Sequence, residues 1–204
     1  MSSPSHWQTV YQTKDLQQVS WYAPHLETSL GLIRRSGVGA SELIADVGGG
    51  AGSLGEDLRR EGFERVIVLD LAHAALATAR LRDTDRTHAP WRGVADARAV
   101  PLGDRALGLW HDRAVFHFLN DPADRGRYVD EVARTVRPGG QVVVATFGPD
   151  GPTRCSGLMV SRYAAADLSA AFGPRFALVD TVTEDHRTPS GAMQSFVYCH
   201  FRRT

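Results

Sequence analysis

Short runs of apolar and β-branched residues alternate along the chain with segments that have the periodicity of amphipathic helices. The runs predict strands at residues 43–48, 65–70, 91–96, 106–113 and 141–147. The periodic segments predict helices at residues 53–62, 73–83 and 161–173. A further helix is expected to begin after Asp121, a good N-cap residue, with Pro122 in its first turn.

The end of the chain has a different pattern. Residues 176–186 and 193–203 are two strand-like runs with no helix between them, which predicts an antiparallel hairpin. The earlier strands alternate with helices, which implies right-handed βαβ units and a parallel sheet covered on both faces. We therefore expect an α/β fold, a doubly wound Rossmann-like sheet of seven strands that is mostly parallel and ends in the hairpin. A single domain is expected over residues 1–204, with N-terminal helices in 1–42 and the core in 43–204.

Composition narrows the choice of partners. The 204 residues include 23 Lys and Arg and 23 Asp and Glu, so no net charge attracts nucleic acid or an acidic membrane surface. No apolar run approaches the roughly 18 residues that span a bilayer. Cys155 and Cys199 do not make a disulfide framework, and no secretory signal is visible at the start. We expect a cytoplasmic protein, a monomer or homodimer, that binds neither nucleic acid nor membrane.

Residues 44–58, IADVGGGAGSLGEDL, contain two overlapping glycine motifs. The first is G-x-G-x-G, formed by Gly48, Gly50 and Gly52. The second is the dinucleotide-type G-x-G-x-x-G, formed by Gly50, Gly52 and Gly55. Glycines between a strand and a helix let the backbone approach a phosphate or nucleoside closely. They also allow a strand and a helix simply to pack closely, so the loop alone is a weak indication of a nucleotide.

Asp70 ends the second predicted strand, 22 residues after Gly48. An acidic residue near this spacing hydrogen-bonds ribose hydroxyls in dinucleotide-binding sheets. The alternative is that Asp70 only caps the helix that follows it. Together the loop and Asp70 favour an adenosine-containing cofactor, and they fit NAD and S-adenosylmethionine (SAM) equally well.

Further features distinguish the two cofactors. Asp96 and Ala97 end the third strand, and Arg137-Pro138-Gly139-Gly140 precedes the fifth. In this order, Asp46 with the glycine loop, Asp70, Asp96 and the R-P-G-G turn resemble the class I SAM-dependent methyltransferases. The resemblance implies SAM as cofactor, S-adenosylhomocysteine (SAH) as product, and Asp46 near the amino group of the methionine part. The alternative is a nucleotide-binding Rossmann module or an NAD-dependent oxidoreductase, but the chain has no second domain for a separate substrate.

The N-terminal segment is rich in aromatic residues. Trp7 and Tyr11 have helical i, i+4 spacing, and Trp21 follows. The segment resembles the N-terminus of small lysine methyltransferases that act on elongation factor or citrate synthase, and the aromatic lids of thiopurine-type S-methyltransferases. Aromatic faces would stabilise the sulfonium of SAM by about 0.5–2 kcal/mol. The alternative is a seam that docks a terminal helix, and Ser20 stands where the lysine enzymes have an acidic residue.

Methyl transfer needs a nucleophile held beside the methyl group and, for some acceptors, a base. Candidate catalytic residues are His111, Asp112 and His117. For His117 the sequence slightly favours the alternative, packing between Phe116 and Phe118, over a role as proton acceptor. Asp112 and Arg113 are equally well explained as a structural ion pair. Residues expected at the cofactor are Trp7, Tyr11, Trp21, Asp46, Gly48, Gly50, Gly52, Asp70, Leu71, Asp96, Ala97, Asp112 and Arg113.

The loop after the fifth strand suggests where the acceptor binds. Its glycines and prolines suit a segment that faces substrate. Candidate substrate residues are Arg154, Cys155 and, on the hairpin, His186. No His, Cys or Asp grouping has the spacing of a metal site. The expected acceptor is a small nucleophile such as a thiol, carboxylate or amine, or a protein lysine.

Overall fold

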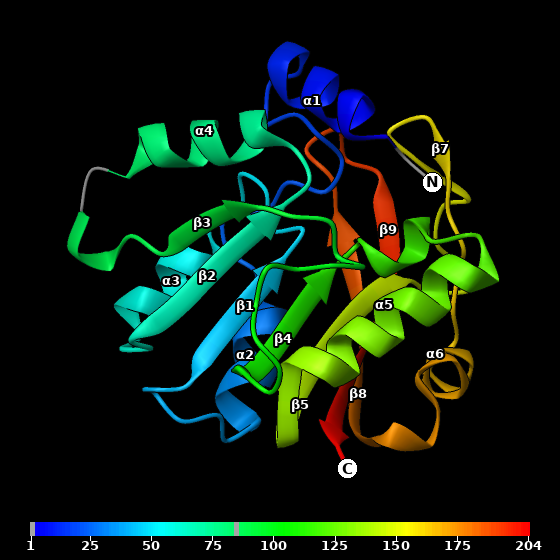
Figure 1. The fold of residues 1–204 in the computed structure, drawn as a ribbon. Coiled ribbons are helices and arrows are strands. Elements are labelled where there is room, and N and C mark those ends of the chain that lie inside the picture. Colours follow the sequence, from blue (N-terminus) through cyan, green and yellow to red (C-terminus); the bar gives the residue numbers. More distant parts are fainter. Residues whose placement is uncertain (1–2, 84–85) are drawn as a thin grey trace.

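A seven-stranded sheet forms the centre of the computed structural model, which describes residues 3–83 and 86–204 (Figure 1). The strand order is β3-β2-β1-β4-β5-β9-β8, with β1 to β5 parallel and β9 antiparallel to both its neighbours. The strands are β1 (Leu43–Val47), β2 (Arg65–Asp70), β3 (Trp91–Val94), β4 (Leu107–Arg113), β5 (Val136–Phe147), β8 (Phe176–Arg187) and β9 (Met193–Arg203). The predicted Rossmann-like α/β fold and its C-terminal hairpin are confirmed.

Helices cover both faces of the sheet. They are α1 (Pro4–Thr13), α2 (Glu27–Arg35), α3 (Leu54–Arg60), α4 (His73–Arg82), α5 (Pro122–Thr135) and α6 (Ala165–Phe172). In Figure 1, α5 and α6 lie in front of the sheet and α2 and α3 behind it. The predicted N-cap of α5 is present, because the Asp121 carboxylate accepts a hydrogen bond from the Ala123 amide at 2.8 Å. Three-residue 3-10 turns lie at Arg86–His88, Phe116–Phe118 and Gly173–Arg175.

The apolar core lies on both sides of the sheet. Large buried side chains between the sheet and α5 and α6 include Trp110, Tyr128, Phe116, Phe172 and Phe201. On the opposite face, leucines and isoleucines of α2 and α3 pack on β1, β2 and β4. Residues 43–47 are all buried, as expected for a central parallel strand covered on both faces.

Three regions differ from the sequence-based expectation. The helix predicted from residue 161 begins at Ala165, because the Ser161 and Tyr163 amides donate to carbonyls of His117 and Phe147 and hold the segment extended. The loop after β5 contains a small hairpin of β6 (Arg154–Cys155) and β7 (Leu158–Met159). β5 begins at Val136 and includes the predicted Pro-Gly turn, where Gly139 has the positive φ of +75° that a type II turn requires.

The strand order reverses between β1 and β4, which lie side by side. In open α/β sheets, ligands bind at the carboxyl ends of the strands at such a switch point. Figure 1 shows α1 across this edge, above the ends of the parallel strands. The order of the strands thus places the loop after β1, the segment after β4 and the N-terminal helix around one site.

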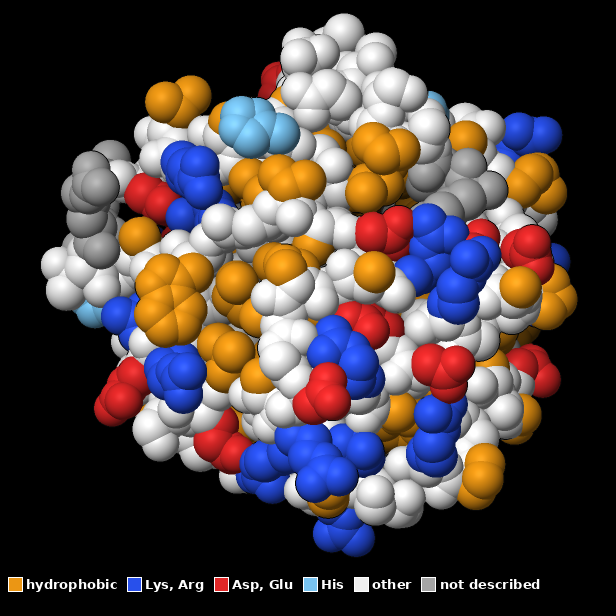
Figure 2. Space-filling view, in the orientation of Figure 1, with side chains coloured by type: hydrophobic (Ala, Val, Ile, Leu, Met, Phe, Trp, Pro, Cys, Tyr) orange, Lys and Arg blue, Asp and Glu red, His pale blue; other side chains and the backbone are white. Residues whose placement is uncertain are grey.

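The surface carries charges of both signs. Figure 2 shows Arg and acidic side chains interspersed over the face formed by α5 and α6, where Arg98 and Arg127 both pair with Asp124. This face has no single-sign field of the kind that binds nucleic acid. Within residues 3–83 and 86–204, none of the helices combines the length and apolar character needed to cross a bilayer.

Candidate active site

The glycine loop turns sharply after β1. Gly48 has a φ of +73° and its amide donates to the Leu69 carbonyl at 2.7 Å, which fixes the turn against the end of β2. A Cβ at Gly48 would collide with the Val115 side chain. Gly50 has a φ of +52° and lies against Tyr11, and a Cβ there would be 3.1 Å from Asp70 Oδ2. The loop backbone therefore takes conformations and approaches that only glycine allows.

Gly55 decides between the two overlapping motifs. It lies inside α3, away from the loop, and its Cβ would be 2.6 Å from Val68 Cγ2 and 2.9 Å from Pro90 Cγ. Its role is the close packing of α3 on β2. Of the G-x-G-x-G glycines, Gly48 and Gly52 line the cavities described below, whereas Gly50 packs against Tyr11 and Gly55 lines neither cavity. The position of Gly55 thus favours the G-x-G-x-G interpretation of the loop over the dinucleotide-type one.

Asp70 lies at the end of β2 with its carboxylate directed back to the loop. Oδ1 accepts from the Ala72 amide at 2.8 Å, and the carboxylate also accepts from the Gly50 backbone. Burial raises the pKa of Asp70 to about 6. The carboxylate accepts from the amide of Ala72, the N-cap residue of α4, and Asp70 also lines a cavity, so the geometry is compatible with both interpretations.

Two adjoining cavities open at the switch point. The first includes about 830 Å³ of empty space, part of which is continuous with open solvent. It is lined by Trp7, Tyr11, Trp21, Val47, Gly48, Asp70, Leu71, Ala95, Asp96, Ala97, Arg113, Ala114, Val115, Phe118, Leu119 and Cys155. The second is lined by Asp46, Gly49, Gly52, Ser53, His111 and residues of 16–26, among others. Both share Tyr11, Trp21, Gly48 and Arg113, which stand where the cavities meet.

Asp46 and His111 form a buried pair in the wall of the second cavity. They occupy matching positions on the adjacent strands β1 and β4, and Asp46 Oδ1 lies 2.8 Å from His111 Nδ1. The other ring nitrogen lies 2.9 Å from Ser29 Oγ on α2. The structure thus brings the predicted catalytic residue His111 to the predicted cofactor residue Asp46, at the methionine side of the expected site.

Asp96 lines the first cavity together with Ala97, as expected for residues near an adenine. Its carboxylate already binds Arg98, with contacts of 2.6 and 3.0 Å, and this side-chain hydrogen bond lowers the Asp96 pKa. Arg98 also pairs with Asp124 of α5 at 2.6 Å. The ion pair fixes the orientation of the carboxylate, whose remaining acceptor positions stay available to a ligand.

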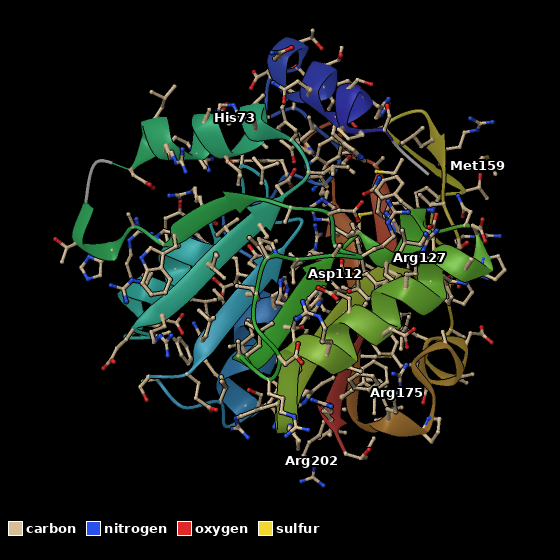
Figure 3. All side chains as sticks on the ribbon, viewed as in Figure 1. His73, Asp112, Arg127, Met159, Arg175 and Arg202 are labelled. Carbon is tan, nitrogen blue, oxygen red and sulfur yellow. The ribbon has the colours of Figure 1, made fainter. Side chains whose placement is uncertain are left out.

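Asp112 requires a correction, because the structure does not bring it to either cavity. Figure 3 places it at the end of β4, on the side toward α5. Its oxygens accept from the Val115 amide at 2.8 Å, the Phe116 amide at 3.0 Å and the Tyr128 hydroxyl at 2.6 Å. The turn arises because Ala114 adopts a φ of +73°, rare for a residue with a side chain. Asp112 holds this turn and lines neither cavity.

His117 also lies away from the cavities. It is fully buried between Phe118 and Phe147, with ring centroids 4.5 and 4.8 Å away. Burial lowers its pKa to about 3, so it is neutral throughout the physiological range. His117 therefore packs between aromatic side chains, and it is not positioned to accept a proton from a ligand in either cavity.

Arg113 is a buried cation at the boundary of the two cavities. Its Nε donates to the Tyr198 hydroxyl at 3.0 Å and its Nη1 to the Trp21 carbonyl at 3.3 Å. The guanidinium stacks on Phe196 at 4.2 Å and lies 3.5 Å from Glu184. Arg113 therefore connects the N-terminal segment to the hairpin beside the site.

The aromatic residues of the N-terminus close the cavities from above. Trp7 lies edge-on to Trp21, with centroids 6.0 Å apart, and to Phe118 at 5.1 Å. Tyr11 is edge-on to Trp21 at 6.4 Å and reaches the loop at Gly50. The helix is held in place at Gln8, whose side chain accepts from the Ala74 amide at the start of α4. The docking seam and the cavity wall are thus formed by the same aromatic residues.

The predicted substrate residues are not all in one place. Cys155 lines the first cavity, but burial raises its pKa to about 11, which keeps the thiol protonated at neutral pH. Arg154 is exposed and donates to the Gly157 carbonyl within its own hairpin, outside the cavity lining. His186 is buried, with Nε2 donating to the Ser20 carbonyl at 2.9 Å, so it anchors the segment that carries Trp21.

Part of the wall of the first cavity is formed by residues that the sequence did not predict. Phe118, Leu119, Val115 and Ala114 line the first cavity because the turn after β4 curves over it, and Ser29 approaches the site from α2. The adjacent Phe-His-Phe run is a signal that could have indicated an aromatic wall at Phe118. No metal-binding cluster of His, Cys, Asp or Glu is found among the described residues.

A comparison with protein families gives one match, described as a methyltransferase domain, over residues 45–144. The matched segment runs from β1 to β5 and contains the glycine loop, Asp70 and Asp96 on this edge of the sheet. The chain belongs to the class I SAM-dependent methyltransferases. SAM is accordingly its cofactor. A comparison with curated proteins gave no match.

Solved structures share the fold at low sequence identity. A SAM-dependent methyltransferase from Anabaena variabilis is 15% identical with a TM-score of 0.77, covering 100% of this chain and 96% of that one. The 1,6-didemethyltoxoflavin-N1-methyltransferase of Burkholderia thailandensis, solved with SAH, is 19% identical with a TM-score of 0.73, covering 98% and 87%. A structure from work on disulfide-to-thioacetal conversion in echinomycin biosynthesis is 18% identical with a TM-score of 0.80, covering 98% and 92%.

Proposed function

We propose that this methyltransferase acts on a small, largely apolar acceptor that binds beneath α1 in the first cavity. The observation that carries this proposal is the lining of that cavity. Trp7, Trp21, Phe118, Leu119 and Cys155 form an apolar and aromatic wall, closed from above by the N-terminal helix. Such a wall favours a planar or apolar ligand, whose burial removes nonpolar surface from water.

The arrangement of polar groups suggests how the cofactor lies. Asp70 and Asp96 provide acceptors for ribose hydroxyls and the adenine amino group at one end of the first cavity. Asp46 provides an acceptor for the methionine amino group in the second cavity. In this arrangement the sulfonium lies where the cavities meet, beside Trp21, Tyr11 and Arg113, and bound SAM supplies the activated methyl group there.

The chain's own residues then hold the acceptor, exclude water and orient the lone pair toward the methyl group. Neither His117 nor Cys155 is suited to remove a proton. His117 lies away from the cavities and is a weak base, because burial lowers its pKa to about 3, and the Cys155 thiol stays protonated because burial raises its pKa to about 11. The acceptor atom is therefore one that has a free lone pair at neutral pH, such as an aromatic nitrogen or a thiolate. The Burkholderia thailandensis enzyme, named for methylation at N1 of a small compound, supports this choice.

A protein lysine fits this wall less well. Its ammonium would lose its hydration against the apolar side chains of the wall, which is costly. The N-terminal resemblance to lysine methyltransferases remains a prediction, and the acceptor experiment includes it as an alternative outcome.

Incubation with methyl-labelled SAM and cell extract, separated into protein and small-molecule fractions, tests the proposal. We expect label in an extractable small compound. Label confined to protein and released as methyl-lysine on hydrolysis would contradict it. A Phe118→Asp variant provides a matched control, because a carboxylate in the apolar wall should reduce acceptor methylation while SAH binding persists.

A further inference from the structure

A chain of buried polar groups runs behind the second cavity. Ser29 of α2 and His111 of β4 are fully buried, and Asp46 of β1 is only 3% exposed. His111 lies between the other two, 2.8 Å from Asp46 Oδ1 and 2.9 Å from Ser29 Oγ. Buried polar groups are retained at low cost only when each has its partner.

The direction of the bond to Asp46 follows from the chemistry of the two groups. A carboxylate only accepts, so Nδ1 of His111 donates to Asp46 Oδ1. Nε2 of the same ring lies against the Ser29 hydroxyl. Because each bond in a buried network polarises its neighbour, Ser29 supports the ring that holds Asp46.

The two oxygens of Asp46 have different surroundings. Oδ1 is held by His111, while Oδ2 lies against Gly49, where a Cβ would collide with it. His111 thus fixes the rotation of the carboxylate and directs Oδ2 to the glycine loop. An acceptor oriented in this way suits a cationic amino group that enters from the second cavity.

We propose that His111 and Ser29 are positioning residues, which hold the Asp46 carboxylate for the amino group of the cofactor's amino-acid part. The proposal rests on the cofactor orientation given above. It separates recognition of the amino-acid part, by Asp46 and its supporting chain, from recognition of the adenosine, by Asp70 and Asp96. His111 then acts through Asp46 and makes no bond in the transfer step.

A pair of ligands separates this role from a general structural one. SAH contains adenosine, sulfur and the amino acid, whereas 5′-methylthioadenosine contains adenosine and sulfur without the amino acid. Their dissociation constants are measured by calorimetry for wild type and variants, with thermal melts as a check of folding. His111→Leu removes the donor to Asp46. His111→Asn retains it, because the asparagine amide nitrogen can occupy the place of Nδ1.

The expected result is a loss of SAH affinity of about tenfold or more in His111→Leu, with methylthioadenosine affinity within about twofold of wild type. His111→Asn should recover most of the SAH affinity. Ser29→Ala, a smaller change, should weaken SAH several-fold and leave methylthioadenosine alone. His200→Asn is the matched control, since His200 is another buried histidine, bonded to Gln141 at 2.8 Å away from the cavities, and should leave both ligands unaffected.

If His111→Leu and Ser29→Ala weakened the binding of SAH and methylthioadenosine equally, or weakened the binding of neither, the positioning role would be overturned. Should His111→Leu fail to fold, Ser29→Ala provides the same comparison of the two ligands. If wild type bound neither ligand, the proposed cofactor site itself would fail, a result distinct from the loss of selectivity.

Discussion

Asp70 should reduce the stability of the protein at neutral pH while supporting its function. Burial raises the carboxyl pKa from its ordinary value of 3.8 to about 6. The folded protein therefore holds the proton on Asp70 to a higher pH than the unfolded chain does. As pH rises from below 3.8 to above 6, the unfolded chain ionises first, and the folded state loses roughly 3 kcal/mol relative to it.

Asp70→Asn removes this titration and keeps an oxygen that can accept from the Ala72 amide. The free energy of unfolding of the variant, relative to wild type, should rise by roughly 2–3 kcal/mol between pH 4 and pH 7.5. Urea denaturation at a series of pH values measures this difference. The same variant should bind SAH more weakly by about 1–3 kcal/mol, because the ribose hydroxyls lose a charged acceptor.

A stability difference that does not change with pH would refute the reasoning on burial. Unchanged SAH affinity in Asp70→Asn and in Asp70→Ala would show that Asp70 only caps α4. Asp121→Asn is the matched control, because Asp121 caps α5 from an exposed position and should show neither effect.

Three further substitutions test the local interpretation. Gly55→Ala should destabilise the fold by about 1–3 kcal/mol in urea titrations, because the added Cβ meets Val68. SAH affinity should not change, and weaker SAH binding would indicate that Gly55 contributes to the cofactor site. Asp112→Ala should lower the free energy of unfolding by about 1–3 kcal/mol, because it leaves the Tyr128 hydroxyl and two backbone amides without their acceptor. The SAH dissociation constant of the folded variant should equal that of wild type, and a selective loss of SAH binding would contradict the role of Asp112 in holding the turn. Trp21→Ala should weaken SAM binding measured by calorimetry, by about 0.5–2 kcal/mol, without loss of the thermal transition; global unfolding would favour a packing role alone.

The fold could be predicted from the sequence, and so could the edge of the sheet at which the cavities lie, because both depend on local signals. Gly48 and Gly50 have positive φ angles that favour glycine, and Asp70 ends β2 and Asp96 follows β3, two strands whose apolar patterns are clear. The order of these elements along the chain determines where they meet in a parallel sheet.

The rest depends on tertiary geometry that no local pattern encodes. Asp112 and His111 are neighbours on β4, yet alternate side chains of a strand point to opposite faces, so one supports the turn under α5 and the other meets Asp46 and Ser29. Ser29 is 82 residues from His111 and reaches it only because α2 packs behind β1 and β4. The exposed position of Arg154 follows from the small hairpin that carries it, which is too short to give a periodic signal.

Calorimetric titration of wild-type protein with SAH, and separately with NADH, distinguishes a SAM-binding site from a dinucleotide-binding one. We expect saturable SAH binding that Asp70→Asn weakens, and no binding of NADH. Binding of NADH without binding of SAH would contradict this expectation.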